Sequence, residues 1–392
     1  MLNTPFSPWP SFTQEEADAV SRVLLSNKVN YWTGNECREF EKEFATWVGC
    51  EYAIALGNGT LALDLALKAL GIGAGDEVIT TSRTFLASAS AIVTAGANPV
   101  FADVDLNSQN LTAGTIEEVV TEKTKAVIVV HLAGMPAEMD EIMALAKEHG
   151  FFVIEDCAQA HGAKYKGRSV GSIGHIGAWS FCQDKIMTTG GEGGMVTTNN
   201  HDLWSTMWSY KDHGKSFDAV YNRQHPPGFR WLHESFGTNW RMTELQGVTG
   251  RIQLQRMAEW TEKRQNNGRL IDRAVVDLSV VRTVEVADYI EHAEYKHYIF
   301  VNPEHLKEGW SRDRILEEIN AVGVPAYQGS CSEIYLEKAF DGTPWRPAKR
   351  LKNALILGET SLMFLVHPTL TEAEMIKTCQ VVRDVLLQAQ AQ

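Results

Sequence analysis

Cysteine is scarce in this chain, and its spacing excludes two kinds of protein. The 392 residues include six cysteines, and no two of them form a Cys-x-x-Cys pair. Zinc ribbons and disulfide-bonded secreted scaffolds both depend on closely spaced cysteines. The composition, with 44% hydrophobic and 22% charged residues, is otherwise that of an ordinary globular protein. We therefore expect reduced thiols, a cytoplasmic location and no metal site.

Long apolar runs and an excess of positive charge are also missing. No stretch reaches the roughly 18 apolar residues that a membrane-spanning helix needs, and residues 1–12 lack the pattern of a secretory signal. The formal net charge is −13 at pH 7, and no basic stripe stands out. Nucleic acids and anionic membranes bind to basic surfaces. The sequence thus predicts that neither a nucleic acid nor a membrane is the partner.

Short β-rich runs alternate with helical runs over the first half of the chain. The predicted strands are "YAIAL", "EVITTS", "NPVFADV", "AVIVVHL" and "FFVIEDC". Near-continuous apolar strands separated by helices indicate an α/β fold with a mostly parallel sheet covered by helices on both faces. We predict a large domain of this kind over residues 13–250. A long amphipathic helix and a mixed pattern follow, which predict a smaller α+β domain over residues 251–392.

Ligands of parallel sheets lie beyond the carboxyl ends of the strands. This rule brings residues 58–60, 82–85, 156–159 and 180–185 to one edge. The glycine turn at 58–60 opens a helix, so it either offers free N–H groups to a phosphate or is an ordinary capped turn. The glycines match neither the Rossmann fingerprint nor the P-loop, which argues against an NAD oxidoreductase and a nucleotide P-loop.

Three kinds of side chain at this edge carry binding or reactive chemistry. Lys185 is either an exposed surface lysine or, when desolvated, a neutral amine that acts as a nucleophile. Glu155 and Asp156 end a buried strand, and alternation turns one of them toward the site, where it serves a cation or a structural pair. Phe85 either packs in the core or stacks on an aromatic ligand. Together these groups suit pyridoxal phosphate, which needs a lysine and an acid opposite its ring nitrogen.

Six segments resemble a known family. They are "FEKEFATWVGCEYAIALGNGTLALDLAL", "GIGAGDEVITTSRTFLASASAI", "VIEDCAQAHGA", "SFCQDKIMTTGGEGGM", "GTNWRMTELQG" and "LMFLVHPTLT". In this order they are similar to the nucleotide-sugar aminotransferases of the DegT type, and the resemblance covers nearly the whole chain. These enzymes have the type I fold of pyridoxal phosphate enzymes. The segment "DKIMTTGGEGGM" most resembles the perosamine-synthase-like members, which aminate carbon 4 of a nucleotide-linked 4-keto-6-deoxy sugar.

The resemblance implies a role for each matching residue. Lys185 matches the Schiff-base lysine, Asp156 the partner of the pyridine nitrogen, and Gln159 a hydrogen-bond donor to the phenolic oxygen of the cofactor. Phe85 matches the aromatic residue that stacks on the cofactor ring. The implied phosphate ligands are Gly59, Thr60, Ser180 and Asn239. In the family this asparagine comes from the neighbouring subunit, which implies a homodimer with two shared sites.

The implied reaction transfers an amino group from L-glutamate to the keto-sugar. Its product is a 4-amino-4,6-dideoxy sugar nucleotide for a surface polysaccharide, such as an O-antigen, or another glycan. Amination at carbon 3 and a non-catalytic regulatory protein that binds pyridoxal phosphate stay open as alternatives. Dehydratase relatives carry histidine in place of Lys185, which disfavours that activity.

The chain departs from the family pattern at two positions near the predicted site, and a third segment nearby has two interpretations. Trp240 stands where tyrosine is common, and the glycine loop after Lys185 is one residue longer than in near relatives. The basic residues and paired prolines of residues 223–236 fit either a rigid loop that faces the substrate or a solvated connector.

Overall fold

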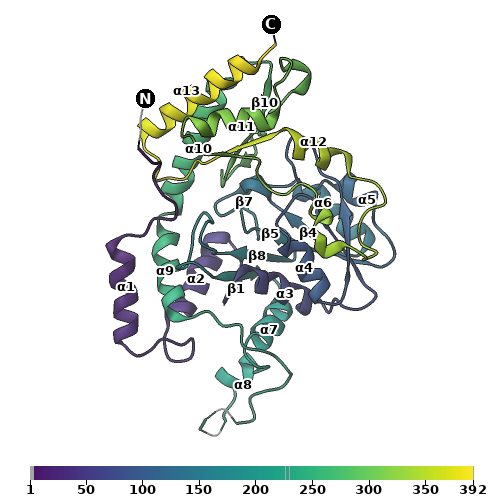
Figure 1. Ribbon diagram of the computed structural model, residues 1–392. Coiled ribbons are helices and arrows are strands. Elements are labelled where there is room, and N and C mark those ends of the chain that lie inside the picture. Colours follow the sequence, from purple (N-terminus) through teal and green to yellow (C-terminus); the bar gives the residue numbers. More distant parts are fainter. Residues whose placement is uncertain (1–3, 226, 229, 392) are drawn as a thin grey trace.

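The large sheet is the centre of the structure, a computed structural model that describes residues 4–225, 227–228 and 230–391. It has seven strands in the order β1-β9-β8-β5-β4-β2-β3 (Figure 1). The strands are β1 (Tyr52–Leu56), β2 (Glu77–Thr81), β3 (Asn98–Ala102), β4 (Thr124–Val130), β5 (Phe152–Asp156), β8 (Ile176–Ser180) and β9 (Gly194–Thr198). Only β9 is antiparallel to its neighbours β1 and β8. The predicted mostly parallel mixed sheet is confirmed.

Helices cover both faces of this sheet, as predicted. Along β4, Ile128 packs into a core cluster with residues of α3, α4 and α7, whereas Val127 and Val129 pack with residues of α6. Alternate residues of a strand point to opposite faces, so both faces are buried. The helices described between the amino terminus and residue 221 are α1 (Gln14–Leu25), α2 (Glu36–Val48), α3 (Gly59–Ala69), α4 (Ala87–Thr94), α5 (Ala113–Glu117), η1 (Leu132–Gly134), α6 (Met139–His149), α7 (His201–Tyr210) and α8 (Phe217–Tyr221).

The C-terminal third forms the predicted smaller α+β part. Its antiparallel sheet has the order β10-β12-β14-β13, and helices α10, α11 and α13 bury an apolar face against it. Its elements are α10 (Met257–Val275), β10 (Val281–Thr283), β12 (His297–Val301), η2 (Pro303–His305), α11 (Arg312–Ala321), β13 (Ala326–Tyr327), η3 (Ile334–Leu336), η4 (Lys338–Phe340), α12 (Lys352–Thr360), β14 (Ser361–Phe364) and α13 (Glu372–Ala389). The exact division at residues 250 and 251 stays a prediction.

Two features differ from the sequence-based expectation. The expected single long helix is two helices, α9 (Glu244–Gln255) and α10, which meet at Arg256. The N–H of Arg256 bonds to the carbonyl of Gln253, three residues back, and this tighter turn ends α9. A third sheet joins β6 (Lys164–Tyr165) to β7 (Arg168–Ser169) and β11 (Ile290–Glu291). Its strands of two residues are too short to show a period in the sequence.

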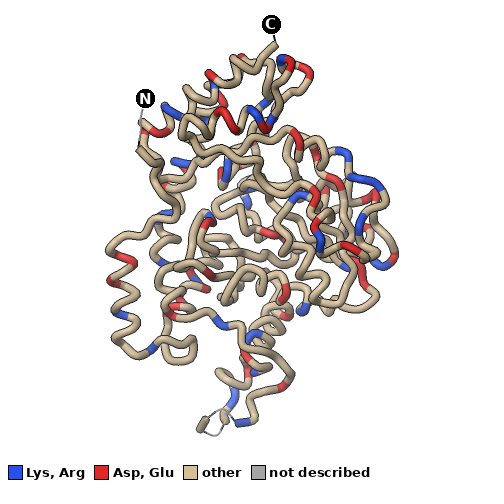
Figure 2. Tube along the Cα trace, in the orientation of Figure 1, with Lys and Arg blue, Asp and Glu red and all other residues tan. Residues whose placement is uncertain are grey.

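Charged residues are spread over the whole fold. In Figure 2, basic and acidic residues are interspersed along the chain trace. Arg251 of α9, for example, forms ion pairs with Glu36 and Glu43 of α2, at 2.6 Å and 2.7 Å. Within the described ranges, no helix is both long and apolar enough to cross a bilayer.

Candidate active site

The strands that share one direction end at one edge of the large sheet. Residues 58–60 follow β1, and Phe85 lies in the turn after β2. Asp156 is the last residue of β5, and Ser180 is the last residue of β8. The topology therefore brings these segments to the same edge, as expected for a ligand site of a parallel sheet.

The amino end of α3 lies directly against Ser180. A Cβ atom placed on Gly59 would lie 2.4 Å from the Cβ of Ser180, so the approach requires glycine. The side-chain oxygen of Asn58 caps the helix by accepting a hydrogen bond of 3.0 Å from the N–H of Leu61. The first N–H groups of a helix have no partner inside it. With the hydroxyls of Thr60 and Ser180, they form a set of donors that suits a phosphate.

Asp156 is a buried carboxylate that faces α4. Its Oδ2 accepts a hydrogen bond of 2.9 Å from the Ser88 hydroxyl, and its Oδ1 accepts one of 3.1 Å from the N–H of Ala158. Burial raises the pKa of Asp156, and the two hydrogen bonds oppose that rise. A cation in contact with the carboxylate would favour its charged form. This requirement fits the protonated ring nitrogen of a pyridine.

Glu155 points to the opposite face of β5 and is part of the scaffold. His131 Nε2 lies 3.0 Å from its Oε2, and the His131 Nδ1 accepts the N–H of Ala137 at 3.1 Å. Burial alone would raise the pKa of Glu155, but the contact with His131 and several backbone N–H groups lower it. Those N–H groups belong to Gly171, Ile173 and Gly174. Of the two carboxylates, Asp156 is therefore the one at the candidate site.

Gln159 and Phe85 are both available to a ligand. The Gln159 Oε1 accepts a hydrogen bond of 2.8 Å from the N–H of Ala133, which leaves the amide nitrogen as a donor on the other side. Phe85 is 71% exposed, which excludes the alternative that it packs in the core. An exposed flat ring at the same edge of the sheet as a buried carboxylate fits an aromatic ligand that stacks on the ring.

Lys185 lies in an irregular loop between β8 and β9 and is half-buried. Its Nζ is 5.1 Å from the ring centre of Tyr295, and the Tyr295 hydroxyl donates to Asp184 Oδ2 at 2.5 Å. Its main-chain N–H donates to the carbonyl of Cys182 at 3.1 Å. The loop then turns back through two glycines with φ of 93° and 116°, Gly190 and Gly191. Contacts on both sides therefore hold Lys185 at this edge of the sheet.

Asn239 stands at the base of a projecting segment, the described residues 213–225, 227–228 and 230–238, which we call the arm. The arm includes α8 and extends away from the sheet in Figure 1. Its ends are joined by the bridge between Asp212 and Asn239, and the next carbonyl, that of Trp240, accepts the N–H of Gly57 at 3.0 Å. Asn239 is exposed. Pro226 and Phe229, two residues of the predicted substrate-facing loop, lie outside the described residues.

These groups together fit pyridoxal phosphate. The cradle at Gly59 and Ser180 suits its phosphate, the buried Asp156 its ring nitrogen, and the free amide nitrogen of Gln159 its phenolic oxygen. Lys185 supplies the amine that the aldehyde carbon requires.

Comparison with known proteins identifies the family of the chain. The profile of the DegT/DnrJ/EryC1/StrS aminotransferase family matches residues 10–383. The chain belongs to this family. The protein is therefore a sugar aminotransferase that depends on pyridoxal phosphate and has the type I fold of such enzymes.

Three relatives illustrate the range within the family. GDP-perosamine synthase of Caulobacter vibrioides is 36% identical over 89% of this chain and 90% of its own length. UDP-N-acetyl-3-dehydro-alpha-D-glucosamine 3-aminotransferase of Acidithiobacillus ferrooxidans is 34% identical over 98% of this chain and 96% of its own. The crystal structure of an aminotransferase from Psychrobacter cryohalolentis superposes with a TM-score of 0.96 at 63% identity, and covers 98% of this chain and 100% of that one.

Three residues of the site were not predicted from the sequence. Ser88, the second residue of α4, donates to Asp156 from a different part of the chain, and no local pattern predicts that contact. Trp9 donates its indole N–H to the carbonyl of Lys185, and Tyr295 lies beside the amine of the same lysine. Trp9 and Tyr295 are each more than a hundred residues away from Lys185 in the sequence, and no local pattern predicts such contacts.

Proposed function

We propose that the protein transfers the amino group of L-glutamate to carbon 4 of a nucleotide-linked 4-keto-6-deoxy sugar. The products are 2-oxoglutarate and a 4-amino-4,6-dideoxy sugar nucleotide, made in the cytoplasm for a surface polysaccharide such as an O-antigen. The observation that carries the proposal is that buried Asp156 and half-buried Lys185 lie at the same edge, where α3 begins, close enough for the lysine charge to lower the pKa of the carboxyl, which burial raises. Similarity to GDP-perosamine synthase supports carbon 4.

Lys185 is the catalytic residue of this proposal. Pyridoxal phosphate, when bound, serves as a sink for the electrons left on the donor carbon. The Nζ of Lys185 in its neutral form takes the proton from the α-carbon of the donor and would deliver it to the former aldehyde carbon of the cofactor, the carbon that receives the amino group. The contacts of Tyr295 and Cys182 with this lysine keep the amine at a fixed position.

The remaining residues bind and orient the cofactor. Asp156 keeps the ring nitrogen protonated, Gln159 donates to the phenolic oxygen, and Phe85 stacks on the ring. The phosphate ligands are Gly59, Thr60, Ser180 and Asn239. Among the described residues, Asp156 accepts hydrogen bonds from Ser88 and Ala158, and a cationic ring nitrogen would complete its coordination.

The assignment of Asn239 as a phosphate ligand of the neighbouring subunit requires a homodimer with two shared sites. The arm carries two almost fully exposed aromatic side chains, Trp231 at 85% and Phe236 at 99% exposure. Aromatic side chains are enriched at the cores of protein interfaces, so these two rings suit contact with a partner subunit. The arm leaves the body of its own chain beside Asn239, which suits a residue that reaches a neighbouring site.

Amination at carbon 3 is the second candidate. The relative from Acidithiobacillus ferrooxidans that supports it is named a 3-aminotransferase and covers 98% of this chain. Family membership favours either sugar aminotransferase over a regulatory protein that only binds the cofactor.

The deciding experiment offers the purified protein a panel of nucleotide-linked 3-keto and 4-keto sugars with L-glutamate as donor. NMR assigns the aminated carbon of each product. We expect amination at carbon 4 of a 6-deoxy sugar, and amination only at carbon 3 would replace the proposal with the second candidate. In parallel, borohydride reduction should leave a pyridoxyl group on Lys185 alone, as detected by mass spectrometry. A label on another lysine would refute the assignment of the catalytic residue.

A further inference from the structure

Three cationic side chains gather around Tyr295. The Nζ atoms of Lys185 and Lys296 lie 5.1 Å and 4.9 Å from the centre of its ring. The Nη1 of Arg264, from α10, donates to the main-chain carbonyl of the same tyrosine at 3.3 Å. The proposed reaction uses only one of these cations, Lys185.

Few negative charges balance this cluster. Asp184 is tied to the Tyr295 hydroxyl at 2.5 Å. Glu294 is engaged by the His297 imidazole at 3.1 Å. Across the described part of the chain, Lys296 has no carboxylate within the 4.0 Å of an ion pair, and its one recorded contact is the tyrosine ring.

Arg264 adds a second unbalanced charge. It is 1% exposed, and its Nε and Nη2 have no hydrogen-bond partner among the described residues. Its guanidinium carbon lies 4.9 Å from the ring centre of Trp9, so one face is covered by an aromatic ring and not by an anion. A buried cation without a counter-ion is unfavourable, and an anion nearby would relieve it.

The titration behaviour of the cluster agrees with this shortage of anions. Burial lowers the pKa of Lys296 to about 8, repulsion by Arg264 and Lys185 adds to the effect, and attraction by Asp184 offsets only part of it. Burial likewise lowers the pKa of Arg264 to about 9. His161 and His367 lie in the same region, and burial lowers the pKa of each to about 3. These imidazoles are neutral, so they neither add to the positive charge nor balance it.

We propose that Lys296 binds the α-carboxylate of the amino-acid donor, with Arg264 behind it strengthening the positive field. The inference rests on the proposed function, because it takes Lys185 as the catalytic amine. The donor's carboxylate is attached to the same carbon as its amino group, which has to reach the position next to Lys185. The diphosphate of the sugar nucleotide is separated from the reacting carbon by the sugar ring. The γ-carboxylate of L-glutamate is two carbons farther from the reacting carbon. Of the three anionic groups that the reaction brings, the α-carboxylate is therefore the one that fits beside this lysine.

The test compares Lys296→Gln with wild type in steady-state kinetics. We expect the KM for L-glutamate to rise about 10- to 100-fold, because a charge-assisted hydrogen bond to the carboxylate is lost. The KM for the keto-sugar should change by less than about twofold. Lys296→Arg keeps the charge and should restore most of the affinity for L-glutamate. The matched control is Lys263→Gln, an exposed lysine of α10 that pairs with Glu259 at 2.9 Å and should leave both constants unchanged.

A binding measurement complements the kinetics. Maleate, an unreactive dicarboxylate, should raise the Tm of the cofactor-loaded wild type and of Lys263→Gln but not that of Lys296→Gln. An unchanged KM for L-glutamate in Lys296→Gln overturns the inference. A selective rise in the KM for the keto-sugar also overturns it and assigns the cation to the diphosphate. If wild type carries no cofactor on Lys185, or does not use L-glutamate, the proposed function itself fails, which is a different result from an unaffected variant.

Discussion

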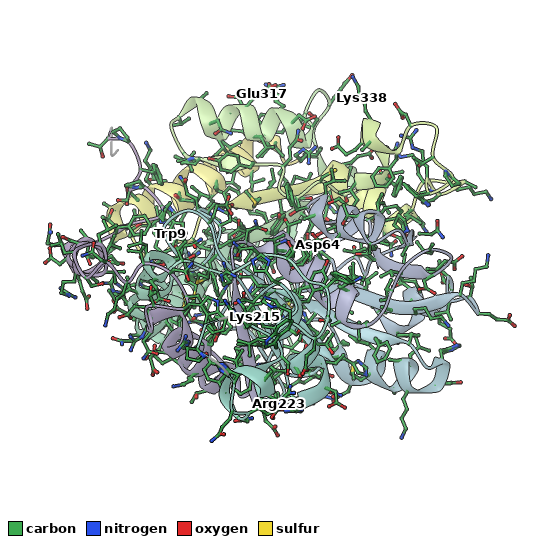
Figure 3. The ribbon with its side chains drawn as sticks, turned by 90° about the horizontal axis from the view of Figure 1, so that it is seen from below. Trp9, Asp64, Lys215, Arg223, Glu317 and Lys338 are labelled. Atoms are coloured by element: carbon green, nitrogen blue, oxygen red, sulfur yellow. The ribbon has the colours of Figure 1, made fainter. Side chains whose placement is uncertain are left out.

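The indole Nε1 of Trp9 donates a hydrogen bond of 2.8 Å to the main-chain carbonyl of Lys185. The same indole packs edge-on against Trp260 of α10, with ring centres 5.1 Å apart, and stacks on His367, with ring centres 5.9 Å apart. In Figure 3, Trp9 lies where the yellow C-terminal helix meets the teal helices. One residue near the amino terminus thus joins the C-terminal part to the loop of the reactive lysine.

The substitution Trp9→Phe tests the importance of the hydrogen bond between Trp9 and the Lys185 loop. In Trp9→Phe the ring packing persists but the donor to the Lys185 carbonyl is lost. We expect kcat to fall about 3- to 10-fold, because one neutral hydrogen bond of the loop is missing. Bound cofactor, measured by visible absorption, and the Tm should stay close to wild type. A kcat equal to that of wild type would show that the loop holds its position without Trp9.

Removing the charge of Asp156 should lower kcat, whereas removing the charge of its neighbour Glu155 should lower the Tm. In Asp156→Asn we expect kcat to fall roughly 100-fold or more, because an amide cannot pair with a protonated ring nitrogen in a buried site. The Tm should change little, since the amide can keep the contacts with Ser88 and Ala158. In Glu155→Gln we expect the reverse, a lower Tm with near-normal kcat for the folded enzyme, because three backbone N–H groups and His131 rely on that charge. Equal losses of kcat would contradict the assignment of the two residues to different faces.

Two phenylalanines offer a matched test of cofactor stacking. Phe85 is 71% exposed, whereas Phe101 of β3 is 4% exposed and packs against Tyr335 and Phe340. We expect Phe85→Ala to leave the free energy of unfolding within about 0.5 kcal/mol of wild type. Its Kd for pyridoxal phosphate should rise about 2- to 10-fold, because a stacked ring pair is lost. Phe101→Ala should instead lower the free energy of unfolding by about 3 kcal/mol or more. A destabilised Phe85→Ala with unchanged cofactor affinity would speak against stacking.

The sequence predicted the sheet and its active edge because both depend on local patterns. Apolar strands separated by amphipathic helices indicate parallel order, and parallel order alone brings Phe85, Asp156 and Ser180 to one edge. The choice between Glu155 and Asp156 was open, because alternation along a strand says that the two diverge but not which face holds the ligand. The contact of His131 with Glu155 decides it, and that contact joins two strands.

Contacts between segments that are far apart in the sequence could not be predicted from it. Trp9, Tyr295 and Lys296 approach Lys185 only because the chain folds back over the large sheet. The break between α9 and α10 was missed as well. It occurs at Arg256, a good helix former, so intrinsic propensity gave no reason to expect it there.

The buried His297 predicts how stability depends on pH. Burial alone would lower its pKa, but Glu294 and Asp272, each 3.1 Å from a ring nitrogen, raise it to about 10 from the ordinary value of 6.5. The folded protein therefore holds a proton that the unfolded chain releases at lower pH. The resulting stabilisation is complete below about pH 6.5 and is lost as the pH rises through about 10.

Denaturation of a variant isolates this contribution. In wild type, the His297 contribution to the free energy of unfolding should decrease between about pH 6.5 and pH 10. In His297→Gln the urea midpoint should be lower at about pH 6.5, and the difference from wild type should shrink as the pH approaches 10. Lys296 has a lowered pKa and contributes with the opposite sign, but it is present in both proteins and cancels in the difference. A difference that is constant over this range would contradict a charged His297.

Mixed dimers test whether Asn239 acts in the neighbouring subunit. Lys185→Ala should abolish turnover, and Asn239→Ala should weaken cofactor binding and activity through the loss of a phosphate ligand. If Asn239 serves the partner's site, a heterodimer of the two variants has one site with both residues intact and one site with neither. Random mixing of subunits should then restore about a quarter of the wild-type activity, because half of the dimers are mixed and each has one intact site. If Asn239 serves its own chain, no site in the mixture is intact and activity stays at the level of the separate variants. Energy transfer between a donor dye on one variant and an acceptor dye on the other confirms that subunits have exchanged before activity is measured.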